Sequence, residues 1–153
     1  MKIIKTLEQA YKKAPYYEET IELIQSILEN KVTSLGSFLG NSLKEIAMYF
    51  GIKTQFIYSS SLGKDNSLKG QDKVIDICKI LNATEYYNTI AGQELYNSDD
   101  FTLNGIDFKF LKTNPIEYSQ FDNQFIPWLS IIDVMMFNSV EEIKAMLGNY
   151  ILA

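Results

Sequence analysis

Two strand-like segments separated by one helical segment constrain the fold of this chain more than any other feature. Residues 54–58 and 84–88 are rich in aromatic and β-branched side chains, which favour strands. Residues 71–81 between them repeat apolar side chains at helical spacing, with Val74 and Cys78 on one face. A strand, a helix and a second strand at this spacing predict a βαβ unit with parallel strands and a right-handed crossover.

A third strand and several helices complete the predicted fold. Residues 106–111 follow Gly105 and alternate apolar with polar side chains, as a half-buried strand does. Helical periodicity covers four further segments, residues 17–29, 34–50, 129–137 and 140–147. Ser139 and Glu142 form a capping box that opens the last of these helices. We therefore expect an α/β fold, with a small parallel sheet of about three strands, a Rossmann-like βαβ core and helices packed around it.

The length of the chain predicts one domain over residues 1–153. Its expected parts are a helical N-terminal part over 1–52, the βαβ core over 53–112, and a loop with C-terminal helices over 113–153. Three strands are few for a sheet whose two faces need cover. We therefore expect a partner to extend the sheet, either a second copy of the chain or a separate N-terminal chain.

Composition excludes several classes of site. The net charge is −5, whereas proteins that bind nucleic acid through its phosphates carry a basic face. All 14 basic residues are lysine, so the sequence holds no arginine and no histidine. A histidine-centred triad, a histidine-ligated metal and a bidentate arginine clamp are therefore excluded, and we expect no metal site. Any acid–base chemistry must use Asp, Glu, Lys, Tyr or Cys.

The sequence points to the cytoplasm. The N-terminal residues have no long apolar core and no small-residue cleavage site, which a secretory signal would require. No apolar run approaches the roughly 20 residues that span a bilayer. The single cysteine, Cys78, has no partner for an internal disulfide, and its place on an apolar helix face predicts a buried side chain.

Polar residues follow each predicted strand, and ligands of parallel α/β sheets bind beyond the carboxyl ends of the strands. The candidates for substrate binding are Ser59, Ser60, Asn88, Gly92, Gln93 and Asn114. Gly92 permits a close backbone approach, and Gln93 offers a donor and an acceptor. Glu94 and Lys112 are the candidates for catalysis. Glu94 is suited to be a general base or to pair with an amine, and Lys112 is suited to neutralise a phosphate or a carboxylate.

Two further residues stand out in the C-terminal part. Asp133 lies in an apolar run, where a carboxylate needs hydrogen bonds to offset its burial. We expect a structural role for Asp133, such as capping backbone N–H groups of the loop over 113–127. Trp128 is placed either to stack on a sugar or to anchor this irregular region to the core.

Five blocks of the sequence resemble the WbqC-like family. They are QAYKKAPYYEE at 9–19, QDKVIDICKILNA at 71–83, TEYYNTIAGQELY at 84–96, NGIDFKFLKTNPIEY at 104–118 and FDNQFIPWLSIIDVMMFNS at 121–139. Their order and spacing match, so the resemblance covers essentially the whole chain. Members of that family begin with a further segment that opens on a motif resembling Gln-Pro-x-Tyr-x-Pro. No such motif is in this sequence, so we expect that segment to be absent.

The resemblance implies a transferase-like protein of surface-polysaccharide synthesis, of the O-antigen type. It implies the transfer of an aminoacyl group, such as glycine, to a sugar, with a small-molecule substrate such as a nucleotide-sugar. It identifies no cofactor. The alternative is a non-catalytic binding or assembly module that pairs with a separate N-terminal chain. The sequence leaves both alternatives open.

Overall fold

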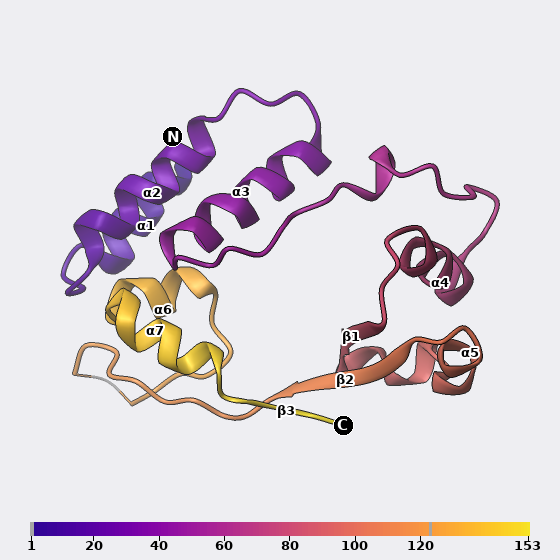
Figure 1. Ribbon diagram of the computed structural model, residues 1–153. Helices are drawn as coiled ribbons and strands as arrows, with labels where there is room; N and C mark the ends of the chain where they lie inside the picture. The colour runs from indigo at the N-terminus through magenta and orange to yellow at the C-terminus, as the bar shows by residue number, and fades with distance from the viewer. Residues whose placement is uncertain (1, 123) are drawn as a thin grey trace. The chain divides into compact units, whose positions relative to one another are not determined.

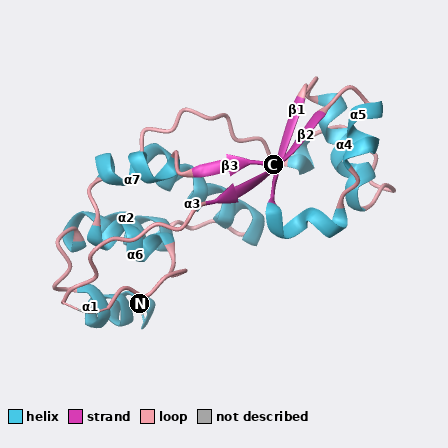
Figure 2. Cartoon of the chain, turned by 90° about the horizontal axis from the view of Figure 1, so that it is seen from below, coloured by secondary structure: helices cyan, strands magenta, loops and turns pink. Residues whose placement is uncertain are grey.

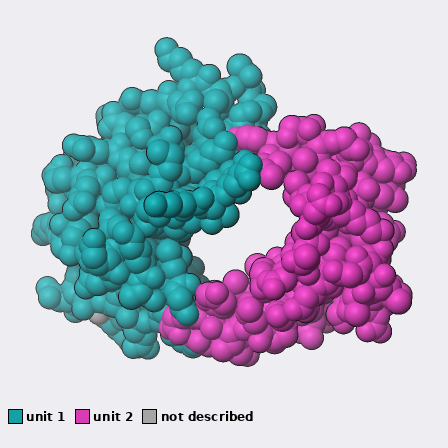
Figure 3. All heavy atoms as spheres, viewed as in Figure 1, with its two compact units in different colours: residues 1–56, 115–148 teal, residues 57–114, 149–153 magenta. Residues whose placement is uncertain are grey.

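The structure is a computed structural model of the chain, and it describes residues 2–122 and 124–153. The chain divides into two compact units, each built from two separate segments of sequence (Figure 3). Unit 1 comprises residues 1–56 and 115–148, and unit 2 comprises residues 57–114 and 149–153. The assignment of residues 1–153 to one domain stays a prediction.

The regular elements in the described part of unit 1 are all helices, and loops connect them (Figures 1 and 2). Its helices are α1 (Lys2–Tyr11), α2 (Tyr17–Glu29), α3 (Leu35–Tyr49), α6 (Ile131–Phe137) and α7 (Val140–Leu147). Helix α2 contacts α1, α3 and α6. The side chains of Phe50, Met135 and Ile143 form the core of the unit. The helices predicted over 17–29, 34–50, 129–137 and 140–147 are confirmed, the third in shorter form.

Local signals in the sequence set the ends of these helices. Ser34 caps α3, because its Oγ accepts a hydrogen bond of 3.1 Å from the N–H of Ser37. Helix α3 ends before Gly51, whose φ of +69° is easily reached only by glycine. Ser139 and Glu142 form the predicted capping box at the start of α7.

Unit 2 holds the sheet (Figure 1). Its elements are the 3₁₀ turn η1 (Ser59–Ser61), α4 (Gly70–Ile80), β1 (Glu85–Thr89), the 3₁₀ helix η2 (Ile90–Leu95), α5 (Ser98–Leu103), β2 (Asp107–Thr113) and β3 (Tyr150–Leu152). The strand order is β1-β2-β3. Strands β1 and β2 are parallel, and β3 pairs antiparallel with β2. The α/β class and the small sheet are therefore confirmed, and the sheet is mixed.

The strand predicted over residues 54–58 is wrong. These residues form no helix and no strand, and all of them are exposed. The Rossmann-like unit that began with this strand is therefore absent from the described chain. The third strand is instead β3, whose main chain continues to Ala153 through two hydrogen bonds with Phe110. Strand propensity alone does not make residues 54–58 a strand. A strand also needs a neighbouring strand whose N–H and C=O groups are free to pair with it.

Aromatic side chains dominate the core of unit 2. Phe101 of α5 has an exposed fraction of 0%. It lies against Tyr86 of β1 and Phe108 of β2, with ring centroids 5.4 and 4.5 Å away. Cys78 belongs to the same core, as predicted, and burial raises the pKa of its thiol. This core covers one face of the sheet, and part of the candidate site described below lies on the same face.

Within the described residues, no helix combines the length and the apolar character needed to cross a membrane.

Candidate functional site

The carboxyl ends of β1 and β2 bring part of the predicted site together. The strand register pairs Asn88 with Phe110. Because side chains alternate between the faces of a sheet, Asn88, Phe110 and Lys112 lie on one face. Lys112 stands about 7 Å further along β2 than Phe110, at the rise of a regular strand. This is the same face that carries the aromatic core, so the two polar side chains lie just beyond that core.

A close contact between Asn88 and Gly92 shapes this edge. The Oδ1 of Asn88 accepts a hydrogen bond of 2.8 Å from the N–H of Thr89. Gly92 lies in η2, and a Cβ atom at this position would stand 3.0 Å from the Nδ2 of Asn88. Glycine therefore lets the turn approach the amide closely. The Nδ2 of Asn88 donates to no acceptor among residues 2–122 and 124–153, so it keeps a donor for a ligand.

Gln93 and Glu94 follow Gly92 in η2, and both are exposed. Because they directly follow Gly92, they lie in the turn after the carboxyl end of β1. An amide supplies a donor and an acceptor, whereas an ionised carboxylate supplies acceptors only. The turn therefore adds two polar groups with complementary hydrogen-bonding ability.

Lys112 and Asn114 differ in how far their side chains are engaged in contacts within the protein. Lys112 is exposed and pairs in register with Ile151 of β3. Asn114 donates two hydrogen bonds to Asn149, one from its N–H and one from its Nδ2, each of 3.0 Å. Asn114 therefore closes the β2–β3 pair, and its role in substrate binding stays a prediction.

The structure places Ser59 and Ser60 in η1, directly after residues 54–58, which form no strand. The Nζ of Lys64 donates a hydrogen bond of 2.5 Å to the carbonyl of Ser59. The two serines were expected near Asn88 because both would follow parallel strands of one sheet. Since no strand precedes η1, that argument does not apply to them. Their role in binding stays a prediction without that support.

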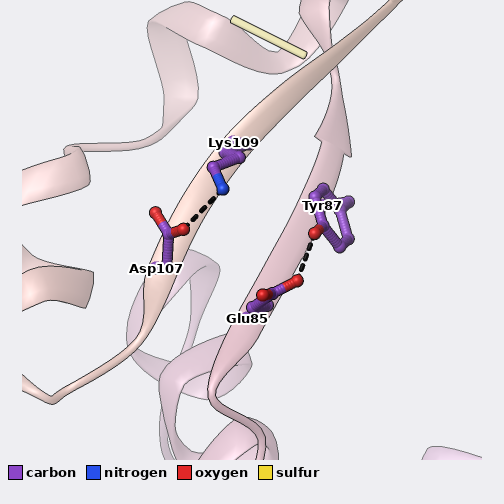
Figure 4. Close-up of polar contacts among 4 residues, drawn as sticks. All are labelled: Glu85, Tyr87, Asp107 and Lys109. Atoms are coloured by element: carbon purple, nitrogen blue, oxygen red, sulfur yellow. Dashed lines mark hydrogen bonds and ion pairs between the residues drawn. The ribbon is translucent and has the colours of Figure 1, made fainter.

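The opposite face of β1 and β2 carries four polar side chains (Figure 4). Lys109 forms an ion pair of 2.6 Å with Asp107, and Tyr87 donates a hydrogen bond to Glu85. The Asp107 carboxylate raises the pKa of Lys109, and the Glu85 carboxylate raises the pKa of Tyr87. Alternation along β2 predicts these outward positions. Each group is paired within its own strand, so this face has the character of a solvated surface.

Asp133 organises a buried polar network in unit 1, and its side chain is only 3% exposed. The hydroxyls of Tyr11 and Tyr118 donate hydrogen bonds of 2.9 and 2.6 Å to its carboxylate. The Nε2 of Gln120 donates a third, of 2.7 Å. Gln120 also bonds the main chain of Ile126 in both directions. The carboxylate therefore holds side chains of α1 and of the loop before α6, whereas we had expected backbone N–H groups as its partners.

This network makes the stability of the fold sensitive to alkaline pH. Burial and the hydrogen bond to Asp133 raise the pKa of Tyr11 to about 12, and the same causes raise the pKa of Tyr118. A raised tyrosine pKa means that the native state favours the neutral phenol. The contribution of the neutral phenol to the free energy of unfolding is complete below the unfolded-state pKa of about 10. It is lost as the pH rises through about 12.

We therefore expect the urea midpoint to fall as the pH is raised from about 10 to about 12. The Tyr11→Phe variant should show a shallower fall, because it cannot ionise at this position. Urea unfolding of both proteins across this range measures the difference. Equal slopes would contradict the assignment of Tyr11 to the network.

A hollow of about 340 Å³ lies in unit 2, apart from any residue that the sequence singled out. It is lined by Leu68, Asp72, Ile75, Asp76, Lys79, Asp100 and Asn104. Two of its carboxylates are already engaged, Asp100 by Gln71 and Asp76 by the N–H of Asp65. Across the described chain, no group of three or more Asp, Glu or Cys side chains is arranged to hold a metal ion.

Comparison with known proteins assigns the chain to a family. The family model described as "WbqC-like protein family" matches residues 1–145, which is nearly the whole chain. No curated protein and no solved structure matches the chain. Because the match begins at residue 1, the expected absence of the family's N-terminal segment is not borne out. The extent of the match, over both units, shows that the chain belongs to the WbqC-like protein family.

Proposed function

We propose that the chain is a transferase of surface-polysaccharide synthesis whose substrate binds at the carboxyl edge of β1 and β2. The carboxyl-edge site comprises Asn88, Gly92, Gln93, Glu94 and Lys112. One observation carries the proposal: the Asn88 amide lies against Gly92 with a donor left over, on the same face as Lys112. Family membership supports a role in biosynthesis, and the polysaccharide setting is what the family resemblance implies.

The side chains of the carboxyl-edge site suit a sugar that carries an anionic group. The Lys112 ammonium is a point charge that suits the phosphate of a nucleotide-sugar or the carboxylate of an amino acid. The amides of Asn88 and Gln93 suit sugar hydroxyls, which both donate and accept hydrogen bonds. The Glu94 carboxylate suits a substrate amine or a proton that leaves the attacking group.

The proposed reaction is aminoacyl transfer, with glycine as the simplest acyl group. An amine or hydroxyl of the sugar attacks the carbonyl carbon of an activated aminoacyl donor. A new C–N or C–O bond forms, the bond from the carbonyl carbon to the leaving group breaks, and Glu94 takes the proton of the attacking group. The cytoplasmic location that the N-terminal sequence and the single cysteine predict belongs to the same proposal.

Thermal unfolding with and without ligands tests this function. A ligand that binds only the native state raises the unfolding midpoint by mass action. We expect nucleotide-sugars to raise the midpoint more than free nucleotides or free amino acids do. The shift should be reduced in the variants Gln93→Ala, Glu94→Ala and Lys112→Ala. If all three variants keep the full shift, the carboxyl-edge site is assigned to the wrong residues.

The Gly92→Ala variant is the sharpest test of the site geometry. The added Cβ would stand 3.0 Å from the Nδ2 of Asn88, so the amide must shift by a few tenths of an ångström from its place in the site. Loss of one hydrogen bond of about 1 kcal/mol predicts binding about five- to tenfold weaker, with little change in stability. The matched control is Gly63→Ala, because nothing lies within 4 Å of a Cβ at Gly63. Equal affinities of the two variants, measured by calorimetric titration, would contradict a role for the close contact.

An assembly module is the second candidate function, and the open edges of the sheet favour it. Strands β1 and β3 each have one neighbour in the described chain, and every residue of β3 is exposed. Unpaired strand edges can add a strand from a second copy of the chain. Sedimentation across a range of protein concentrations separates the two functions. A monomer that binds a nucleotide-sugar favours the enzyme, and a dimer without ligand binding favours the module.

A further inference from the structure

Trp128 combines two features that the packing of the chain does not explain. Its side chain is 83% exposed, and its backbone φ is +63°. A bulky L-residue in the left-handed region is rare and costs roughly 1–2 kcal/mol. Burial of the indole would offset such a cost, but this indole is in water. Strained backbone at an exposed side chain is typical of a residue that contacts a ligand.

The chain on both sides of Trp128 is held in place. On one side, Gln120 bonds the N–H and the carbonyl of Ile126 and is itself held by the buried Asp133. On the other side, Ser130 caps α6 by accepting a hydrogen bond of 3.2 Å from the N–H of Ile132. Pro127 between these two points has a fixed φ. The indole is therefore presented to solvent on a rigid support, which lowers the entropy cost of binding.

We propose that Trp128 is a stacking platform for the pyranose ring of an uncharged saccharide. One face of a pyranose is a sheet of C–H groups, which gains dispersion contacts on a flat indole. The sugar hydroxyls point outward from the ring and stay hydrated or bond polar side chains nearby in the sequence, such as Asp122 and Gln124. Ile126 and Leu129 are also exposed and extend the apolar surface beside the indole.

The charge of the surrounding sequence disfavours an anionic ligand. Residues 113–143 contain no lysine, arginine or histidine. The same segment carries Glu117, Asp122, Glu141 and Glu142 in addition to the buried Asp133. A phosphate group or an anionic lipid surface would meet the carboxylates of this segment and no basic side chain from it. This separates the ligand of Trp128 from the phosphate-bearing ligand proposed for Lys112.

The proposal for Trp128 does not depend on the carboxyl-edge site. Trp128 belongs to unit 1, whereas Asn88, Gly92 and Lys112 belong to unit 2. A saccharide that binds at Trp128 would be an acceptor glycan or a glycan partner of the protein. Variants of Lys112 and variants of Trp128 therefore test the two proposals separately, and either one can fail alone.

Fluorescence of the full chain tests the proposal directly, because Trp128 is the single tryptophan. The probes are N,N′-diacetylchitobiose, maltose, uridine diphosphate, and vesicles of phosphatidylcholine with phosphatidylglycerol. We expect a saturable change in emission with at least one of the two disaccharides and none with the diphosphate or the vesicles. No change with either disaccharide would overturn the proposal, and so would a response to the diphosphate or the vesicles alone.

The variant Trp128→Asn separates a binding role from a structural one. Asparagine tolerates the left-handed region better than tryptophan does, so the thermal midpoint should rise. Calorimetric titration should show at least tenfold weaker disaccharide binding. The control is Leu103→Ala, an equally exposed apolar residue of unit 2, which should keep the affinity. A lower midpoint for Trp128→Asn, or an unchanged affinity, would show that the indole serves the fold and would overturn the proposal.

Discussion

Replacing Phe101 with alanine is expected to lower the free energy of unfolding by about 3–5 kcal/mol, the usual cost of truncating a buried phenylalanine. Phe101 is fully buried, and its ring is parallel to that of Tyr86 within 3°. Its centroid also lies 6.1 Å from that of Tyr96. Its removal leaves a cavity between α5 and the sheet. Few other side chains can fill that cavity, because the core of unit 2 is small.

Urea unfolding with a linear extrapolation measures this loss. The matched control is Leu103→Ala, since Leu103 lies two residues away in the same helix and is 84% exposed. That substitution should change the free energy of unfolding by no more than about 0.5 kcal/mol. Equal effects of the two variants would mean that α5 does not pack on the sheet. Because β1 leads into the carboxyl-edge site, Phe101→Ala should also abolish any ligand-dependent shift.

Replacing Asp133 with alanine is expected to lower the free energy of unfolding by about 3–4 kcal/mol. The carboxylate accepts three hydrogen bonds, from Tyr11, Tyr118 and Gln120. Each donor left unsatisfied in a buried place costs about 1–3 kcal/mol, and some of the three will reach water. Loss of the anchor also frees Gln120, which holds Ile126.

The control for this experiment is Asp122→Ala, which removes an exposed carboxylate from the same loop. Asp133→Asn is a second informative variant, because it keeps the shape but places an NH₂ group against donors. We expect Asp133→Asn to be destabilised nearly as much as Asp133→Ala, and Asp122→Ala to remain close to the parent protein. A fully stable Asp133→Asn would mean that the charge and the acceptor capacity of Asp133 do not matter.

The elements that the sequence predicted correctly are those that short-range signals determine. The apolar stripe of α3, the cap at Ser34 and the box of Ser139 with Glu142 each involve residues within a few positions of one another. Strands β1 and β2 carry a dense set of aromatic side chains and are separated by a short crossover. Local propensity and tertiary packing agree in these segments, so the pattern alone was sufficient.

The elements that the sequence did not predict depend on distant partners. Residues 54–58 have the composition of a strand but belong to no strand of the sheet, whereas β3 has three residues and pairs with β2 across 37 positions of sequence, from Thr113 to Tyr150. The three donors to Asp133 likewise come from α1 and from the loop before α6. No local sequence pattern predicts such pairings. Whether two segments far apart in sequence meet depends on the packing of the whole chain, which must offset the entropy cost of closing a long loop.

The candidate site divides in the same way. Asn88 and Gly92 are four residues apart, so the turn that joins them was visible in the sequence. The sequence does not reveal that Ser59 and Ser60 follow no strand, because the composition of residues 54–58 is that of a strand. The sequence identifies Trp128 as an aromatic residue in an irregular segment, but only the structure shows its φ of +63°.

The interleaving of the two units has a consequence for the synthesis of the protein on the ribosome. Residues 1–56 of unit 1 emerge first, but the rest of that unit, residues 115–148, follows only after most of unit 2. Thr20 of α2 must wait for its acceptor, the carbonyl of Met135. After Thr20, 115 further residues must be translated to reach Met135, which takes roughly 6–23 s at ordinary elongation rates. During this interval the apolar faces of the first three helices have nothing to pack against except one another, so the nascent chain is a natural client for chaperones.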